Sequence, residues 1–247
     1  MTAIEVAGLS KRFGGLRAVD DVSLAVAPGE RRVLIGPNGA GKTTLFHCIT
    51  GMMRPTTGRI ALFGDDVTAL PENRRTALGM GRTFQISNVF TDLTAVENLS
   101  LAALGTAPAK WTMRRPLTAF SDLRERALAG LAEVGLDPAR GDDPVRRLSY
   151  GERRQLELAL ALACRPKVLF LDEPCAGLSP SERQRFVALV QGLPRTVTIV
   201  MIEHDMDVAL GLADQVTVLH HGRVILDGTP DRVRTDPEVR EIYFGNA

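Results

Sequence analysis

The stretch GPNGAGKTT at residues 36–44 decides the fold, because it lies between a strand-like RRVLI at 31–35 and a helix-like LFHCI at 45–49. It follows the pattern G-x-x-x-x-G-K-T in the strand–loop–helix setting that a phosphate-binding loop requires. Glycines allow successive backbone N–H groups to turn toward one anion, and the helix N-terminus adds partial positive charge. The stretch therefore predicts an α/β protein with a nucleotide phosphate site.

The residues of this loop have separable roles. Lys42 is placed to reach the β- and γ-phosphates, and the Thr43 hydroxyl is placed to ligate Mg²⁺. A glycine-rich turn without a ligand would not need Lys-Thr at that offset. The pattern therefore predicts ATP or a similar nucleotide with Mg²⁺ as the ligand, and the remaining contacts come from Gly36, Asn38, Gly39, Gly41 and Thr44.

Two further strands end in candidate catalytic residues. VLFL at 168–171 is followed by Asp172 and Glu173, and TVTIVMIE at 196–203 is followed by His204. In a parallel sheet, ligands gather at the carboxyl ends of the strands. We expect Asp172 to act on Mg²⁺ through a bridging water, Glu173 to orient or deprotonate the attacking water, and His204 to contact the γ-phosphate. A plain turn after 171 and a helix-capping histidine are the alternatives.

LSYGERRQLELALALA at 148–163 has leucines at every second position, as a strand would. Alanines fill the other positions, and Ala and Leu are strong helix formers, so we expect a buried helix that begins just after Ser149. Ser149 is then either only an N-cap or part of an anion site at the helix N-terminus.

The order of the predicted elements indicates how the chain is organised. Strands are expected at 3–7, 22–26, 31–35 and 58–64, a helical block with no good strand occupies about 92–163, and strands and helices alternate afterwards. Such alternation predicts a parallel sheet covered by helices. Residues 104–117, around Trp111, are expected to form a loop.

Composition limits the possible functions. The 247 residues have a net charge of +1, so we expect no general attraction to nucleic acid. The three cysteines lack metal-ligand spacing and are expected to be reduced thiols. The N-terminus lacks the apolar segment of a signal peptide, and the longest apolar runs are too short for a bilayer, so a membrane role would require a separate partner chain.

With the phosphate loop, LSYGE, LFLDEP and His204 in this order, the chain resembles the ATPase subunits of ABC transporters nearly end to end. The resemblance implies one domain over 1–247, with a RecA-like P-loop core, an antiparallel β part and a helical subdomain inserted near 88–160. It also implies that LSYGE is the signature motif. Its members Ser149, Gly151 and Glu152 would then bind the γ-phosphate of ATP held by the opposite subunit.

The same resemblance suggests further roles. Phe13 matches the aromatic residue that stacks on adenine, and Gln85 matches a residue that contacts Mg²⁺ and the attacking water and connects to the membrane partner. Residues 174–180 match the D-loop. Three residues depart from the family pattern: Tyr150 and Glu152 in the signature, and Ser179, where many members have the D-loop aspartate.

GRTFQISNVF, EPCAGLSP, VMIEHDM and the C-terminal tail resemble importers of branched-chain, or hydrophobic, amino acids. This implies transmembrane permease subunits, a second ATPase subunit in a heterodimer or a homodimer, a periplasmic solute-binding protein and a peripheral position at the cytoplasmic face of the membrane. Importers of urea, amides or aromatic acids, a lipid-export ATPase and a soluble ABC protein are the alternatives. Glu173 and His204 argue against a non-hydrolytic regulatory partner.

Overall fold

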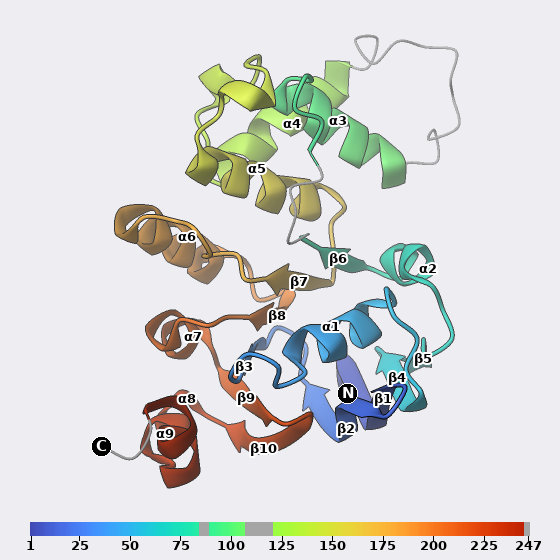
Figure 1. The fold of residues 1–247 in the computed structure, drawn as a ribbon. Coiled ribbons are helices and arrows are strands. Elements are labelled where there is room, and N and C mark those ends of the chain that lie inside the picture. The colour runs from blue at the N-terminus through green and yellow to red at the C-terminus, as the bar shows by residue number, and fades with distance from the viewer. Residues whose placement is uncertain (84–88, 107–120, 245–247) are drawn as a thin grey trace.

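A computed structural model describes residues 1–83, 89–106 and 121–244, and it contains two sheets and a separate group of helices (Figure 1). The larger sheet has the strand order β10-β9-β3-β8-β7-β6. Its neighbouring strands are parallel except β9 and β10, which form an antiparallel pair. The bounds are β3 Arg31–Ile35, β6 Met80–Arg82, β7 Val168–Asp172, β8 Thr198–Ile202, β9 Gln215–His220 and β10 Arg223–Gly228.

The two faces of this sheet pack against different layers. Every residue of β3, β7 and β8 is buried, as expected for parallel strands covered on both faces. Leu34, Phe170 and Val200 pack with the buried residues of α1 (Lys42–Thr50), whereas Val33, Leu169 and Ile199 share a core with helices of the opposite side. The alternation of side chains along each strand thus divides the core into two clusters.

The smaller sheet is antiparallel and has the order β2-β1-β4-β5. Its strands are β1 Ile4–Phe13, β2 Leu16–Val26, β4 Thr57–Leu62 and β5 Asp65–Asp66. Its apolar residues, including Ile4, Val6 and Ile60, join the cluster around α1, so this helix lies between the two sheets (Figure 1). The antiparallel β part expected from the resemblance is therefore present.

Three helices form a group beside the core sheet (Figure 1). They are α3 Ala95–Thr106, α4 Ser121–Glu133 and α5 Tyr150–Ala163, with short 3-10 turns at Pro138–Arg140 and Val145–Arg147. The helix expected after Ser149 is confirmed. The remaining helices are α2 Glu72–Ala77, α6 Pro180–Gly192, α7 Met206–Leu212, α8 Pro230–Thr235 and α9 Pro237–Phe244. Within the described ranges, none of the helices has the length and hydropathy needed to cross a membrane.

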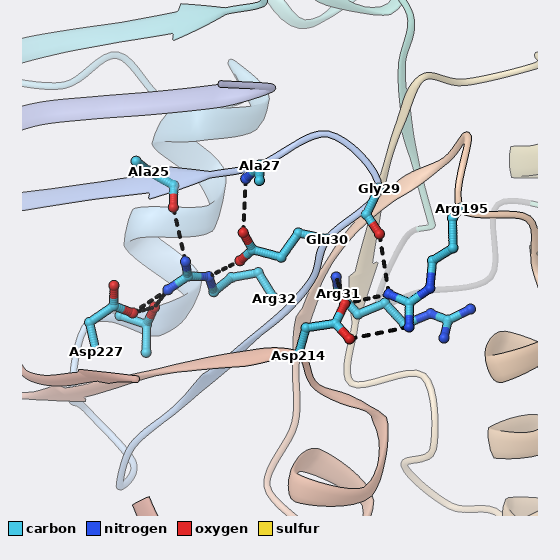
Figure 2. A network of polar contacts seen from close by, with 10 residues as sticks. Ala25, Ala27, Gly29, Glu30, Arg31, Arg32, Arg195, Asp214 and Asp227 are labelled. Atoms are coloured by element: carbon cyan, nitrogen blue, oxygen red, sulfur yellow. Dashed lines mark hydrogen bonds and ion pairs between the residues drawn. The ribbon is translucent and has the colours of Figure 1, made fainter. Parts of the chain in front are cut away.

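A buried arginine joins the two sheets. Arg32 of β3 is 3% exposed and donates to Glu30 at 2.7 Å, to Thr217 of β9 at 2.9 Å and to the carbonyl of Ala25 in β2 at 2.9 Å. It also pairs with Asp227 of β10 (Figure 2). A planar guanidinium has five N–H donors in a fixed fork, which suits it to hold several acceptors at once.

Some sequence-based expectations about the elements require correction. The strand expected at 3–7 continues to Phe13, and the strand expected at 22–26 already begins at Leu16. Both are longer because they pair with each other as a long hairpin across β-bulges. Strand β6 was not expected, since its three residues are too short for a periodic pattern. The loop expected at 104–117 is wrong for residues 104–106, which form the last turn of α3; Trp111 lies outside the described residues.

Candidate nucleotide site

The phosphate loop joins the carboxyl end of β3 to α1, as its sequence predicts. Gly36 has φ 153°, and a Cβ there would lie 2.2 Å from the carbonyl oxygen of Leu219. At Gly41 φ is 99°, and a Cβ would lie 2.3 Å from the carbonyl oxygen of Ala18. Both positions therefore require glycine, because a side chain would meet backbone atoms that cannot move aside.

The first turn of α1 is open to an anion. Gly41 is its N-cap, and no described side chain accepts a hydrogen bond at this cap. Lys42 is 5% exposed, and its Nζ donates to the carbonyl oxygens of Gly36 at 2.6 Å and Pro37 at 3.1 Å. Burial lowers the pKa of Lys42, and the charge of Glu173 raises it in part. The ammonium group is thus inside the loop whose amides would surround a phosphate.

The other loop residues lie where the pattern predicts. Asn38 and Gly39 are exposed at the tip of the loop, and Thr43 and Thr44 are half-buried in the first turn of α1. Phe13, the last residue of β1, is 46% exposed with Lys11 Nζ 5.2 Å from its ring centroid. Nearly half of the Phe13 surface is thus exposed, and stacking on adenine would require such exposure.

Asp172 ends β7 and is 2% exposed. Its Oδ2 lies 3.5 Å from a guanidinium nitrogen of Arg82 in β6, and its Oδ1 has no hydrogen-bond partner among the described residues. Burial raises the pKa of this carboxyl, Arg82 lowers it and Glu173 raises it further. The sequence analysis did not identify Arg82; the only signal was a basic residue in GRTFQ just before Gln85.

The residues present fit a Mg²⁺–nucleotide rather than a metal bound by protein alone. Among the described residues, no group of three or more His, Cys, Asp or Glu side chains could hold a metal ion. Mg²⁺ commonly binds through one or two carboxylates together with substrate phosphates. The Thr43 hydroxyl would supply one ligand, the buried Oδ1 of Asp172 would act through a bridging water, and the ion would neutralise phosphate charge. Gln85, the third expected ligand, lies outside the described residues.

Glu173 and His204 come together at the carboxyl ends of β7 and β8. Glu173 Oε1 lies 2.6 Å from His204 Nε2. Glu173 has φ 46°, a conformation that few residues other than glycine adopt, and its N–H donates to Ile202 O at 3.1 Å. Strained backbone of this kind persists where the surrounding structure holds it and is found often at active sites. The structure therefore brings Glu173 and His204, two of the residues expected to be catalytic, into direct contact, and the third, Gln85, lies outside the described residues.

A second glutamate, Glu203, which the sequence analysis missed, contacts the backbone next to this pair. Glu203 is 3% exposed, and it accepts hydrogen bonds from the backbone N–H of Cys175 at 3.1 Å and of His204 at 3.2 Å. Burial raises its pKa, whereas these bonds lower it. Glu203 thus connects the loop after Glu173 to the loop that carries His204. The available signal was an acid at the end of an otherwise apolar strand.

The expected signature residues lie at the exposed N-terminus of α5, outside the phosphate loop of their own chain. Ser149 is the N-cap and accepts from Glu152 N at 3.2 Å, while Glu152 Oε2 accepts from Ser149 N at 2.7 Å. The other oxygen of Glu152 pairs with Arg140 at 2.7 Å. Ser149 is therefore the N-cap of α5, as one of the two alternatives predicted. Both carboxylate oxygens of Glu152 are engaged within the chain. Ser179 makes a second capping box at the start of α6.

The parallel sheet, the glycine-dependent phosphate loop and the buried acid that ends β7 define a P-loop nucleotide hydrolase with an added group of helices. The ABC transporter family model matches residues 19–176, and that of the branched-chain amino acid ATP-binding cassette transporter matches 223–247. The chain belongs to the ABC transporter family, in which it is an ATPase subunit.

Individual relatives and solved structures match most or all of the chain. The chain is 40% identical to the high-affinity branched-chain amino acid transport ATP-binding protein BraF of Pseudomonas aeruginosa, over 99% of this chain and 98% of that protein. The ADP conformation of MJ1267, an ATP-binding cassette of an ABC transporter, is 30% identical with a TM-score of 0.88, covering 100% of both chains. A dimeric post-hydrolysis state of MJ0796, bound to ADP and Pi, is 25% identical with a TM-score of 0.77 over 92% of this chain and 98% of that one.

Proposed function

We propose that this chain hydrolyses ATP to drive import of branched-chain or other hydrophobic amino acids through separate permease subunits. The observation that carries this proposal is the agreement with BraF along the whole chain, together with the match of 223–247 to the branched-chain transporter model. The C-terminal segment includes α8 and α9, whose Val233 and Val239 are 0% and 1% exposed in the main core. The described part of this segment, up to residue 244, is thus part of the fold.

The proposed hydrolysis uses the site residues in the following way. Lys42, the amides of 36–44 and Phe13 bind ATP, while Thr43, Asp172 and Gln85 hold Mg²⁺. Glu173 orients the water and takes its proton, with one carboxylate oxygen held by His204 at 2.6 Å. Ser149 and Gly151 face a second ATPase subunit and complete the site around the ATP bound there. The exposed N-terminus of α5 supports this last role.

A groove on the same molecule supports contact with a membrane subunit. Its volume is about 860 Å³, and it lies between α2, β6, α3 and α5. Residues lining it include Thr83 and Val89, which flank the stretch that contains Gln85, and Glu157 of α5. A permease segment in this groove would contact both the core and the helical subdomain. The chain would then act at the cytoplasmic face of the membrane as a peripheral subunit.

Reconstitution tests the proposal. The chain is purified with its permease subunits, its second ATPase subunit and its periplasmic solute-binding protein, and uptake of labelled leucine, isoleucine and valine into proteoliposomes is measured with ATP inside or outside. We expect uptake that requires ATP on the side of this chain. Uptake of urea, amides or aromatic acids but not of these amino acids would contradict the proposed solute, and movement of lipid instead would contradict import.

A further inference from the structure

The first turn of α5 contacts the loop 174–179, which joins Glu173 to α6. The Tyr150 hydroxyl donates to the carbonyl of Ala176 at 3.0 Å. A Cβ on Gly177, which has φ 77°, would lie 3.1 Å from the Tyr150 ring and hydroxyl. On the next residue of α5, a Cβ on Gly151 would lie 2.4 Å from Glu182 Oε1 of α6. Gly177 therefore allows a close approach between this turn and the loop, and Gly151 allows one between this turn and α6.

The Tyr150 hydroxyl also accepts a hydrogen bond from its own helix. Arg154 donates to it at 2.8 Å, with the guanidinium carbon 5.3 Å from the ring centroid. The same guanidinium pairs with Glu157 at 2.9 Å, and both of these side chains are at most 10% exposed. Glu157 lines the groove between the core and the helical subdomain. Hydrogen bonds and an ion pair therefore run from the groove, along one face of α5, to the loop after Glu173.

The direction of these bonds follows from their chemistry. Arg154 has only donors and Ala176 O is only an acceptor, so the phenol must accept from one and donate to the other. Hydrogen bonds in such a chain polarise one another. Ala176 in turn donates its N–H to Glu173 O at 3.0 Å, and Cys175 N donates to Glu203 at 3.1 Å. The carbonyl that Tyr150 holds therefore belongs to the turn that positions Glu173.

We propose that Tyr150 is a positioning residue for Glu173, and that the line Glu157–Arg154–Tyr150–Ala176 couples the groove to the loop 174–179. Movement of α5 at the groove is passed to the turn that carries the hydrolytic carboxylate. This inference rests on the proposed function, because the groove is the proposed permease contact and Glu173 the proposed base. Phenylalanine at position 150 would fill the same space but could neither accept from Arg154 nor donate to Ala176.

Hydrogen exchange tests the coupling without any turnover. Exchange at 174–179 is measured by mass spectrometry on the purified full chain, with Tyr150→Phe, Arg154→Lys and both together. Lysine keeps the charge but loses the guanidinium fork. We expect each single variant to speed exchange in the loop about 5-fold, as loss of one hydrogen bond implies, and the double variant to add little. Unchanged exchange in Tyr150→Phe, or fully additive effects, would overturn the proposal.

Arg153→Lys is the matched control. Arg153 is the residue just before Arg154 in α5, and it donates to Leu148 O at 3.1 Å and Arg146 O at 3.0 Å, both within the helical subdomain. The same substitution there should leave exchange at 174–179 unchanged. Faster exchange in the loop with this control as well would mean that general loosening of α5 is responsible, and the specific role of Tyr150 would be refuted.

Kinetics of the assembled transporter provide a second readout. With Tyr150→Phe we expect kcat for ATP to fall several-fold while KM changes less than twofold, because the carboxylate is displaced and the phosphate loop is not. A raised KM at unchanged kcat would contradict the positioning role. If the wild-type assembly did not hydrolyse ATP, the proposed function would fail, while the exchange result would still decide whether Tyr150 holds the loop.

Discussion

Glu173 and His204 are 31 residues apart in sequence, yet Glu173 Oε1 and His204 Nε2 are 2.6 Å apart. The strands before them are parallel neighbours, with Asp172 of β7 paired with Ile202 of β8. Their side chains remain 22% and 43% exposed, so the pair faces solvent at the edge of the phosphate site. The histidine engages one of the two oxygens of the Glu173 carboxylate.

We expect Glu173→Gln to bind ATP normally and to lower kcat by a factor of ~10²–10⁴, the usual contribution of a general base. The amide keeps the shape of the side chain and loses its basicity. ATPase rates and equilibrium nucleotide binding would be measured in parallel. Glu133→Gln, an exposed position at the end of α4, is the control and should keep the wild-type rate. Normal turnover in Glu173→Gln would remove this residue from the role.

Lys42→Ala should abolish tight ATP binding, because it removes the buried ammonium group that the phosphate loop surrounds. Titration calorimetry on the isolated chain would measure the affinity directly. Lys167→Ala is the comparison: Lys167 lies outside the phosphate loop, with its Nζ 5.5 Å from the ring centroid of Phe63. Equal ATP affinity in both variants would rule out the assigned phosphate site.

Ser149→Asp separates the two possible roles of this serine. Aspartate is as good an N-cap as serine, so the stability of the isolated chain should change by less than about 0.5 kcal/mol. ATP-dependent dimerisation, measured by light scattering in the Glu173→Gln background, should be lost, because the added carboxylate would repel the γ-phosphate. An unaffected dimer would leave Ser149 as a helix cap only.

Arg32→Met should lower the free energy of unfolding by about 3 kcal/mol, the lower end of the ~3–5 kcal/mol expected for breaking a buried pair. The lower end applies because Asp227, one of its two acidic partners, is 42% exposed. Urea denaturation of the nucleotide-free chain measures the change in the free energy of unfolding. Arg59→Met breaks a pair whose side chains are 54% and 52% exposed, and it should cost less than about 1 kcal/mol. Similar losses in both variants would refute the role of Arg32 as a joint between the sheets.

The three thiols should differ in reactivity. Burial raises the pKa of Cys48 to about 11, and it also raises the pKa of Cys175, where the charge and hydrogen bond of Glu203 raise it further. At pH 8 only about 10⁻³ of Cys48 would be thiolate. Iodoacetamide, followed by mass spectrometry, should modify half-buried Cys164 first and all three in urea. Rapid labelling of Cys48 in the folded chain would contradict its burial.

Much of the fold and the phosphate site could be predicted from the sequence because the relevant signals are local. The phosphate loop is one continuous segment, so its glycines, Lys42 and Thr43 are identifiable without tertiary structure. Apolar runs followed by Asp172 or His204 locate strand ends in the same way. The helix after Ser149 was also predicted correctly, because the propensity of Ala and Leu outweighs the alternating leucines.

Other features depend on segments that meet only after folding. The pairing of Arg82 with Asp172, and the hydrogen bond that Glu203 accepts from Cys175 N, join segments far apart in the chain, and no sequence spacing encodes their distances. Tyr150 was identified from sequence only as a departure from a family pattern, whereas its bond to Ala176 requires α5 to lie against the loop after Glu173. The sequence alone thus determined the phosphate loop and the approximate carboxyl ends of the strands before Glu173 and His204, because these depend on local periodicity and residue type. Only tertiary structure decided which side chains face one another, because helix and sheet packing brings together residues from separate segments.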